Sequence, residues 1–261
     1  MKNLILACSA LVLVITSCSK SSDDAAVAPV VTPPTSTSIL LKKFIVTPAG
    51  APTGITTDIT YNGNKIVKSV SSDGTSKVFT YTGDLITKIE EFVGLILDSS
   101  VTLSYNANGK LETYIELIYD SPTIGMGTKE TYSYRTATTM TYTNKSGDLA
   151  TQNLLEFNAT ATFTNGEITK IEKVTGSSTT PAVVNYTYDS KNNPFKNVTG
   201  YAATSFVDSE PTGFVLNVLT RIEPANTFGN ELNTYTYDSN NYPLTQSKVY
   251  GFRTFNTQYF Y

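Results

Sequence analysis

A short repeated unit constrains the fold of this chain more than any other feature. In it, an aromatic-Thr-aromatic strand leads through an Asn/Gly/Asp turn into a return strand that contains Lys. Gly and Asn stand where a tight turn needs positive φ, so each unit predicts a β-hairpin. Copies recur at a spacing of roughly 20 to 29 residues, the length of a hairpin plus its connection. The clearest copies are 59–68, 79–89, 103–113, 161–171, 186–189 and 235–238.

Side chains within the repeats alternate as in strands that have one covered face. Phe79 and Tyr81 share one face, and Thr80 and Thr82 share the other. No window of helical length shows a 3.6-residue apolar stripe. In the stretch from Leu111, the same alternation is expected to place Leu111, Thr113, Ile115, Leu117 and Tyr119 on one face and Glu112, Tyr114, Glu116 and Ile118 on the other.

The predicted fold class is all-β. We expect an antiparallel up-and-down meander of β-hairpin repeats with roughly a dozen or more strands. Such a sheet must be strongly curved or closed into a barrel, because a flat open sheet leaves its edge strands unpaired. Departures from a regular array are expected at about 118–131 and 201–233.

The N-terminus has the pattern of a lipoprotein signal peptide. Lys2 precedes an apolar run from Leu4 to Ile15, which is too short for a spanning helix of ~20 residues. Ile15-Thr16-Ser17-Cys18 is similar to the lipobox of bacterial lipoproteins. That resemblance implies cleavage after residue 17 and lipidation of Cys18.

The expected domain organisation follows from this start. Residues 1–17 are predicted to be the signal peptide, 18–38 the lipidated Cys and a disordered Ser/Thr/Pro tether, and 39–261 a single β-repeat domain. The tail from Ser19 to Asp24 resembles the acidic export signal of some Gram-negative surface lipoproteins. We therefore expect an outer-membrane, lipid-anchored protein that is surface-exposed, with the periplasmic face as the alternative.

Composition excludes several kinds of chemistry. The 261 residues include no His and 2 Cys, and Cys8 lies in the predicted signal peptide. The expected mature domain therefore has no His- or Cys-based nucleophile, thiolate metal site or disulfide partner. A net charge of -3 does not favour nucleic acid as a partner. We predict no cofactor and no metal.

The aromatic C-terminal strand, Gln258-Tyr259-Phe260-Tyr261, makes a transmembrane barrel an alternative. Charged residues on the predicted outer faces argue against it, since each Lys near the bilayer midplane costs ~2–4 kcal/mol. Such residues are Lys68, Lys88, Glu90, Lys170 and Glu172. A water-soluble, lipid-tethered barrel or curved sheet is the prediction.

Two late copies of the repeat carry a family resemblance. Tyr-Thr-Tyr-Asp at 186–189 and 235–238 is followed by Ser-Lys-Asn-Asn-Pro-Phe and Ser-Asn-Asn-Tyr-Pro-Leu. The pattern resembles the tyrosine-aspartate repeats of Rhs-type proteins. It is more similar to a family of bacterial lipoproteins with a porin-like β fold and hairpin repeats. The resemblance implies fold and location but no established activity.

Catalysis would depend on carboxylates here. Asp120, Asp208, Glu210 and Glu223 lie in segments expected to be irregular, and Arg135, Arg221 and Arg253 are the arginines, but no spacing selects a catalytic pair. Asp189 and Asp238 stand beside Asn residues, where they favour Asx-turn capping over a calcium loop. No catalytic residue is predicted.

Tyrosine is the remaining candidate for function. Strand tyrosines such as Tyr61, Tyr81, Tyr105, Tyr188 and Tyr237 are expected to fill the core. Aromatic residues outside the regular repeat are the predicted binding surface, because binding residues concentrate on loops of a rigid scaffold. They are Tyr119, Tyr201, Phe206 and Phe214.

The sequence thus predicts a membrane-tethered cell-envelope lipoprotein that is not an enzyme and has a binding or structural role. Its partners are the membrane, through the N-terminal lipid, and a carbohydrate, lipid or protein ligand. The alternatives are a carboxylate-dependent glycan hydrolase and a carrier that encloses a lipid-like ligand in a closed sheet.

Replacing Cys18 with Ala should prevent lipid attachment and release the protein from membranes. Membrane fractionation and labelling with a radioactive or alkyne-bearing fatty acid measure the two effects. Cys8→Ala is the matched control and should leave both unchanged. Undiminished labelling of the C18A variant would refute the lipidation prediction.

Overall fold

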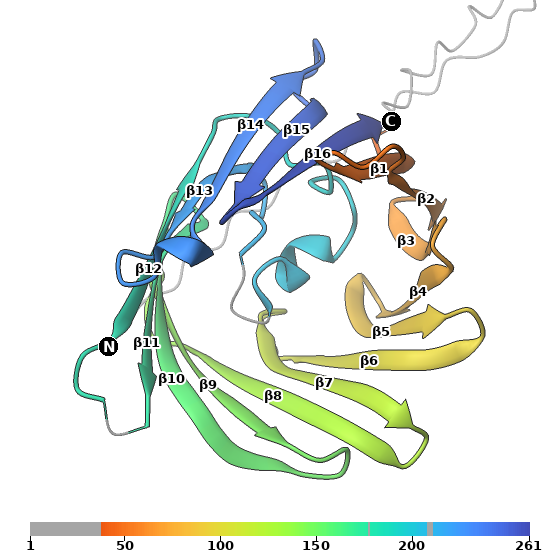
Figure 1. Cartoon of the computed structure of the whole chain (residues 1–261). Coiled ribbons are helices and arrows are strands. Elements are labelled where there is room, and N and C mark those ends of the chain that lie inside the picture. The colour runs from red at the N-terminus through yellow and green to blue at the C-terminus, as the bar shows by residue number, and fades with distance from the viewer. Residues whose placement is uncertain (1–37, 177, 208–210) are drawn as a thin grey trace, which may run out of the picture. The chain divides into compact units, whose positions relative to one another are not determined.

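The computed structural model describes residues 38–176, 178–207 and 211–261, in which sixteen antiparallel strands close into one barrel (Figure 1). The sheet follows chain order, and β1 closes it against β16 with Phe44 opposite Tyr259. The predicted all-β up-and-down meander of hairpins is confirmed, and the sheet is closed. The strands are β1 (Lys43–Pro48), β2 (Ile55–Asn62), β3 (Lys65–Ser71), β4 (Thr75–Thr82), β5 (Leu85–Val93), β6 (Ile96–Tyr105), β7 (Leu111–Ser121), β8 (Ile124–Tyr134), β9 (Thr139–Gly147), β10 (Gln152–Thr164), β11 (Glu167–Thr175), β12 (Ala182–Tyr188), β13 (Val218–Ile222), β14 (Glu231–Tyr237), β15 (Pro243–Tyr250) and β16 (Arg253–Phe260).

The compact unit that contains the barrel spans Ser38–Tyr261. The predicted signal peptide, Cys18 and nearly all of the predicted tether lie outside the described residues. At the start of the unit, the Asn64 side-chain amide donates to the Ser38 hydroxyl over 2.9 Å. The proposed boundaries at residues 17 and 38 remain predictions.

The two ends of the barrel differ. At one end the repeat turns, such as those at Gly63 and Gly83, lie beside a long connection between β12 and β13. We call this the plug end, and the connection, residues 189–207 and 211–217, the plug. Figure 1 shows the plug's short 3-10 helix η1 (Tyr201–Thr204) inside the ring of strands. The other end, with turns such as those at Gly74 and Gly94, is the open end.

Most hairpins with a turn at the plug end share a β-bulge directly after that turn, whereas the β8–β9 hairpin pairs without one. In β4–β5, Tyr81 pairs with Ile86 but Thr80 pairs with Lys88, so Thr87 is an extra residue. The same shift occurs in the β2–β3, β6–β7, β10–β11, β12–β13 and β14–β15 pairs. A bulge interrupts the ladder and leaves a backbone group without its strand partner.

Tyrosine hydroxyls of the following hairpin bond to the carbonyls at these bulges. Tyr105 donates to the Ile86 carbonyl over 2.6 Å, and Tyr188 donates to the Ile168 carbonyl over 2.7 Å. Tyr235 donates in the same way to Val218 over 3.0 Å. Burial raises the pKa of Tyr105 well above its ordinary value, so the hydroxyl keeps its proton and remains a donor. The repeated tyrosines therefore connect neighbouring hairpins, as their predicted place in the core requires.

The bulge after Tyr105 corrects one sequence expectation. Tyr105 pairs with Leu111 and Ser104 with Thr113, so the two-residue alternation changes phase at Glu112. Leu111 and Tyr114 both point into the core, with 1% and 3% of their surface exposed. The expected grouping of Leu111 with Thr113, Ile115, Leu117 and Tyr119 on one face was therefore wrong. The expected irregularity at 118–131 was also wrong, because this stretch forms the β7–β8 hairpin.

The outer face of the barrel carries charged and hydroxyl side chains among exposed apolar ones such as Val70 and Leu232. Lys68, Lys88 and Lys170 lie opposite threonine or asparagine residues on the neighbouring strands. Those threonine and asparagine residues alternate along their strands with buried residues, so these lysines point outward. Outward ion pairs join Lys88 to Glu90 at 2.6 Å and Lys170 to Glu172 at 2.9 Å. Cross-strand hydroxyl contacts such as that between Thr236 and Thr245, at 2.6 Å, also lie on this face. Within the described part of the chain, no helix is long and apolar enough to cross a membrane.

Replacing Tyr105 with Phe should lower the free energy of unfolding by about 1–3 kcal/mol, because the carbonyl of fully buried Ile86 loses its tyrosine donor. Urea denaturation measures this change. Tyr119→Phe is the matched control, since its hydroxyl contacts the Ser100 hydroxyl on the outer face and no bulge carbonyl. Equal losses in the two variants would contradict the role of the bulge carbonyl.

Candidate ligand-binding lumen

A buried carboxylate holds the plug in the barrel. Glu167, at the start of β11, is 1% exposed. Its Oε2 accepts from the Phe214 amide over 2.8 Å, and its Oε1 accepts from the amides of Val215 and Leu216 over 2.8 and 3.0 Å. Three backbone donors compensate the desolvation of this charge. Glu167 thus fixes the C-terminal part of the plug to the barrel wall.

The rest of the plug is bonded to several other strands. Asp189 accepts from the Asn217 backbone amide over 3.1 Å and from its side-chain amide over 3.0 Å. The Thr199 amide donates to the Asn64 carbonyl over 2.9 Å. Gly200 has φ 76, and a Cβ there would lie 2.6 Å from the Asp84 carbonyl oxygen. The plug is therefore a fixed floor for the space above it.

Three adjoining cavities lie between the plug and the barrel wall, with volumes of about 260, 240 and 260 Å³. Tyr201 lines all three, and Phe195 lines two of them. The two rings are stacked, with centroids 4.4 Å apart and planes 17° apart. We call these cavities together the lumen. Its floor therefore includes a pair of stacked aromatic rings.

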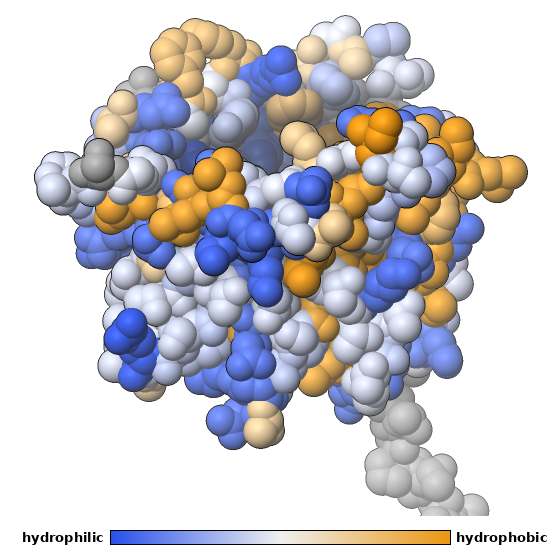
Figure 2. All heavy atoms as spheres, turned by 90° about the horizontal axis from the view of Figure 1, so that it is seen from below, coloured by the Kyte–Doolittle hydropathy of each residue, from blue (hydrophilic) through white to orange (hydrophobic). Residues whose placement is uncertain are grey.

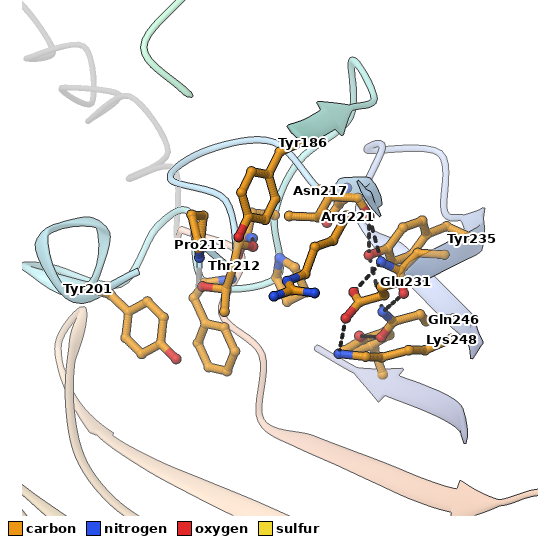
Figure 3. Close-up of a pocket in the computed structure, with 16 residues that line it drawn as sticks. Tyr186, Tyr201, Pro211, Thr212, Asn217, Arg221, Glu231, Tyr235, Gln246 and Lys248 are labelled. Atoms are coloured by element: carbon orange, nitrogen blue, oxygen red, sulfur yellow. Dashed lines mark hydrogen bonds and ion pairs between the residues drawn. The ribbon is translucent and has the colours of Figure 1, made fainter. Parts of the chain in front are cut away.

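One wall of the lumen is a hydrogen-bonded polar network on β14–β16 (Figure 3). Lys248 pairs with Glu231 at 2.7 Å, and Asn233 donates to the same carboxylate over 2.6 Å. Gln246 donates to Asn233 over 2.9 Å and accepts from Tyr259 over 2.6 Å. All five residues line one cavity. Such a wall presents both donors and acceptors in fixed positions.

Further charges lie elsewhere around the lumen. Lys77 pairs with Glu91 at 2.9 Å, and Glu116 lines the same cavity. Arg221 donates to the Gly229 carbonyl and lies 3.7 Å from Glu223. Charges of both signs therefore line the wall, which gives it little net charge.

Tyr201 is a suitable group to contact a ligand. Burial is the main cause that raises its pKa to about 12, and the neighbouring Tyr81 contributes. The hydroxyl is thus protonated at neutral pH and can donate or accept a hydrogen bond. Its ring contacts Phe195 on one face.

The four predicted binding residues do not form one surface. Tyr119 lies in regular strand β7, with its hydroxyl 3.0 Å from Ser100 on the outer face. Tyr201 lies in the lumen floor. Phe206 and Phe214 pack against each other at the plug end, with ring centroids 5.5 Å apart. Phe206 is 5% exposed and also contacts Tyr132, at a centroid distance of 5.4 Å.

The candidate carboxylates are scattered. Asp120 is exposed at the end of β7, and Glu223 is near Arg221. Asp208 and Glu210 lie outside the described residues. Arg135 is exposed beside Thr141, and Arg253 begins β16. The described residues contain no group of three or more His, Cys, Asp or Glu that could hold a metal ion.

The Asx-turn assignment is confirmed at both tyrosine-aspartate motifs. The Asp189 carboxylate accepts from the Lys191 amide over 2.9 Å. The Asp238 carboxylate accepts from the amides of Asn240 and Tyr242, both over 2.8 Å.

Large exposed apolar side chains gather at the open end. Leu95 and Ile96 are 98% and 75% exposed at the β5–β6 tip, and Phe252 is 90% exposed at the β15–β16 tip. Figure 2 shows hydrophobic residues along the upper part of that view, with a hollow between the tips. Other exposed apolar side chains lie on neighbouring strands, among them Ile118, Ile124, Met126, Leu154 and Leu232.

Sequence reasoning missed the polar wall. Arg221, Glu231, Gln246 and Lys248 were not singled out as a group. The available signal was the alternation in the last repeat, where Asn233, Tyr235 and Tyr237 share a face. Assigning Gln246 and Lys248 to the same side required the register across the bulge at Tyr237.

Comparison with solved structures supports the fold. The chain is similar to a porin-like protein from Bacteroides vulgatus, with a TM-score of 0.56 and 13% identity over 86% of this chain and 99% of that one. A porin-like protein from Bacteroides uniformis aligns with a TM-score of 0.40 and 15% identity over 84% of this chain and 97% of that one. No protein-family model matches the chain, and no curated protein matches it in sequence. The first likeness supports a barrel of this architecture.

Replacing Glu167 with Gln should loosen the plug, because three amides lose their charged acceptor. We expect a loss of about 3 kcal/mol in unfolding free energy, with faster proteolysis within 189–217. Denaturation and mass-mapped limited proteolysis measure the two effects. The control is Glu172→Gln, on the outer face of the same strand, which should change the unfolding free energy and the rate of proteolysis only slightly. Wild-type protease resistance of E167Q would show that Glu167 does not fix the plug.

Proposed function

We propose that this protein is a non-catalytic binding barrel that takes a carbohydrate into its lumen. The observation that carries the proposal is the stacked Phe195–Tyr201 floor beneath a wall of fixed donors and acceptors. Sugar rings combine flat C–H faces, which pack on aromatic rings, with hydroxyls that both donate and accept. The pairing of such a floor with such a wall fits that chemistry.

The lumen suits a lipid-like ligand less well. Lys77, Glu91, Arg221, Glu231 and Lys248 line its cavities. Placing an alkyl chain against these groups would desolvate ion pairs without replacing their bonds to water. A polar ligand replaces those bonds by its own hydroxyls. This argument favours carbohydrate over the enclosed-lipid alternative.

For location, we propose an outer-membrane lipoprotein tethered through Cys18, with its barrel in water and surface-exposed. The lipobox pattern at 15–18 supports the anchor. Outward lysines at positions 68, 88 and 170 support a barrel outside the bilayer, since each would cost ~2–4 kcal/mol near the midplane.

A glycan hydrolase remains the second candidate because of one observation. Glu91 and Glu116 line the same cavity, on strands that flank β6. Hydrolysis needs two carboxylates, one of them protonated as a general acid. The Glu91 carboxylate lies 2.9 Å from the Lys77 ammonium, so an ion pair already engages one of the two carboxylates that hydrolysis would need. We therefore favour binding without turnover.

Replacing Tyr201 with Ala should weaken carbohydrate binding about tenfold or more, because the floor loses one of its two rings. A glycan array with the full chain identifies the ligand, and calorimetry measures its affinity. Tyr119→Ala, on the outer face, is the matched control and should bind as wild type. Unchanged binding by Y201A would overturn the lumen as the site.

Turnover is tested with the same glycans. We expect no hydrolysis by wild type, measured by chromatography of the products. If wild type hydrolyses a glycan and Glu116→Gln does not, the protein is a glycan hydrolase and the binding proposal is wrong.

A further inference from the structure

A second concave site lies at the plug end, separate from the lumen. It is a groove of about 360 Å³ between the plug and the tips of the β6–β7, β8–β9 and β10–β11 hairpins. Its apolar lining includes Leu111, Tyr134, Phe163, Phe206 and Phe214. The volume lies within the range typical of small-molecule sites. Two of the aromatic residues that the sequence singles out, Phe206 and Phe214, are therefore in one wall.

A single charge borders this groove. Of its lining residues, all of which are described, only Lys110 carries a formal charge. The Lys110 ammonium lies 4.7 Å from the centre of the Tyr134 ring, so it is held over an apolar wall. No salt bridge to Lys110 occurs among the described residues. The charge is available to an anionic group outside the protein.

The floor of the groove is rigid. Phe214 donates its backbone amide to Glu167, and Phe206 packs between Tyr132 and Phe214. Ala203, from η1, exposes only a methyl group to the groove. Because these walls are fixed by the plug contacts, the groove is preformed and a ligand would not have to open it.

We propose that this groove binds a fatty acid, with the alkyl chain against the phenylalanines and the carboxylate on Lys110. An alkyl chain gains about 0.8 kcal/mol per CH₂ that leaves water, and the groove offers it few polar groups to desolvate. A single lysine matches a carboxylate, whereas a phosphate group is usually held by several donors. A sugar would leave most of its hydroxyls without partners here. This site is independent of the proposed lumen site.

The test uses dodecanoate below its micelle concentration and the full chain. Calorimetry should show saturable binding to wild type. Ala203→Trp fills the groove and should abolish binding, while Ala150→Trp, at an exposed turn of the open end, should bind as wild type. Unfolding curves check that both variants are folded. If A203W does not fold, Ala137→Trp, at the β8–β9 tip, fills the same groove and takes its place in the test.

The role of the charge is tested separately. Lys110→Gln should weaken dodecanoate binding about tenfold and leave binding of dodecanol unchanged. The proposal is overturned if wild type does not bind dodecanoate, if the groove-filled variant binds it normally, or if K110Q affects both ligands equally. Carbohydrate binding is measured in the same variants, and we expect no change, which separates this site from the lumen.

Discussion

Closure of the sheet by β1 and β16 is the constraint on which the rest of the structure depends. Six residue pairs, from Lys43–Phe260 to Pro48–Phe255, join the two ends of the meander. Closure removes both edge strands and separates an inner from an outer face. The inner face can then collect aromatic and charged side chains, while the outer face carries threonine and paired charges.

The inner space would be too wide for the strands' own side chains to fill, and the plug occupies one end of it. Glu167 makes this possible, because it supplies a buried acceptor for three plug amides that would otherwise lack partners. The plug also presents Phe195 and Tyr201 toward the lumen and Phe206 and Phe214 toward the groove at the plug end. One irregular segment thus helps to form two chemically different sites.

The repeat predicted much of the fold because hairpin turns and alternation are local properties. Gly63 and Gly83 take positive φ, as the turn pattern required, and Tyr61, Tyr81, Tyr105 and Tyr188 pack against the core cluster. Tyr237 lies outside that cluster, and its hydroxyl donates to the Asp189 carboxylate. The prediction failed where a bulge changed the phase of the alternation. At Glu112 this reversed the faces of Tyr114, Glu116 and Tyr119, and a one-residue shift is not visible in composition.

The sequence by itself determined the hairpins, the outward lysines and threonines and the absence of His chemistry, since these depend on residue identity and near neighbours. Tertiary structure alone decided which side chains converge. Arg221, Glu231 and Gln246 come from three strands, and Tyr201, from the plug, lines the same cavity. Their convergence depends on the strand register of the closed barrel and on the hydrogen bonds from the plug to Glu167. Both join residues that are far apart in the sequence. No local pattern specifies them, because their energies arise only after the barrel has closed.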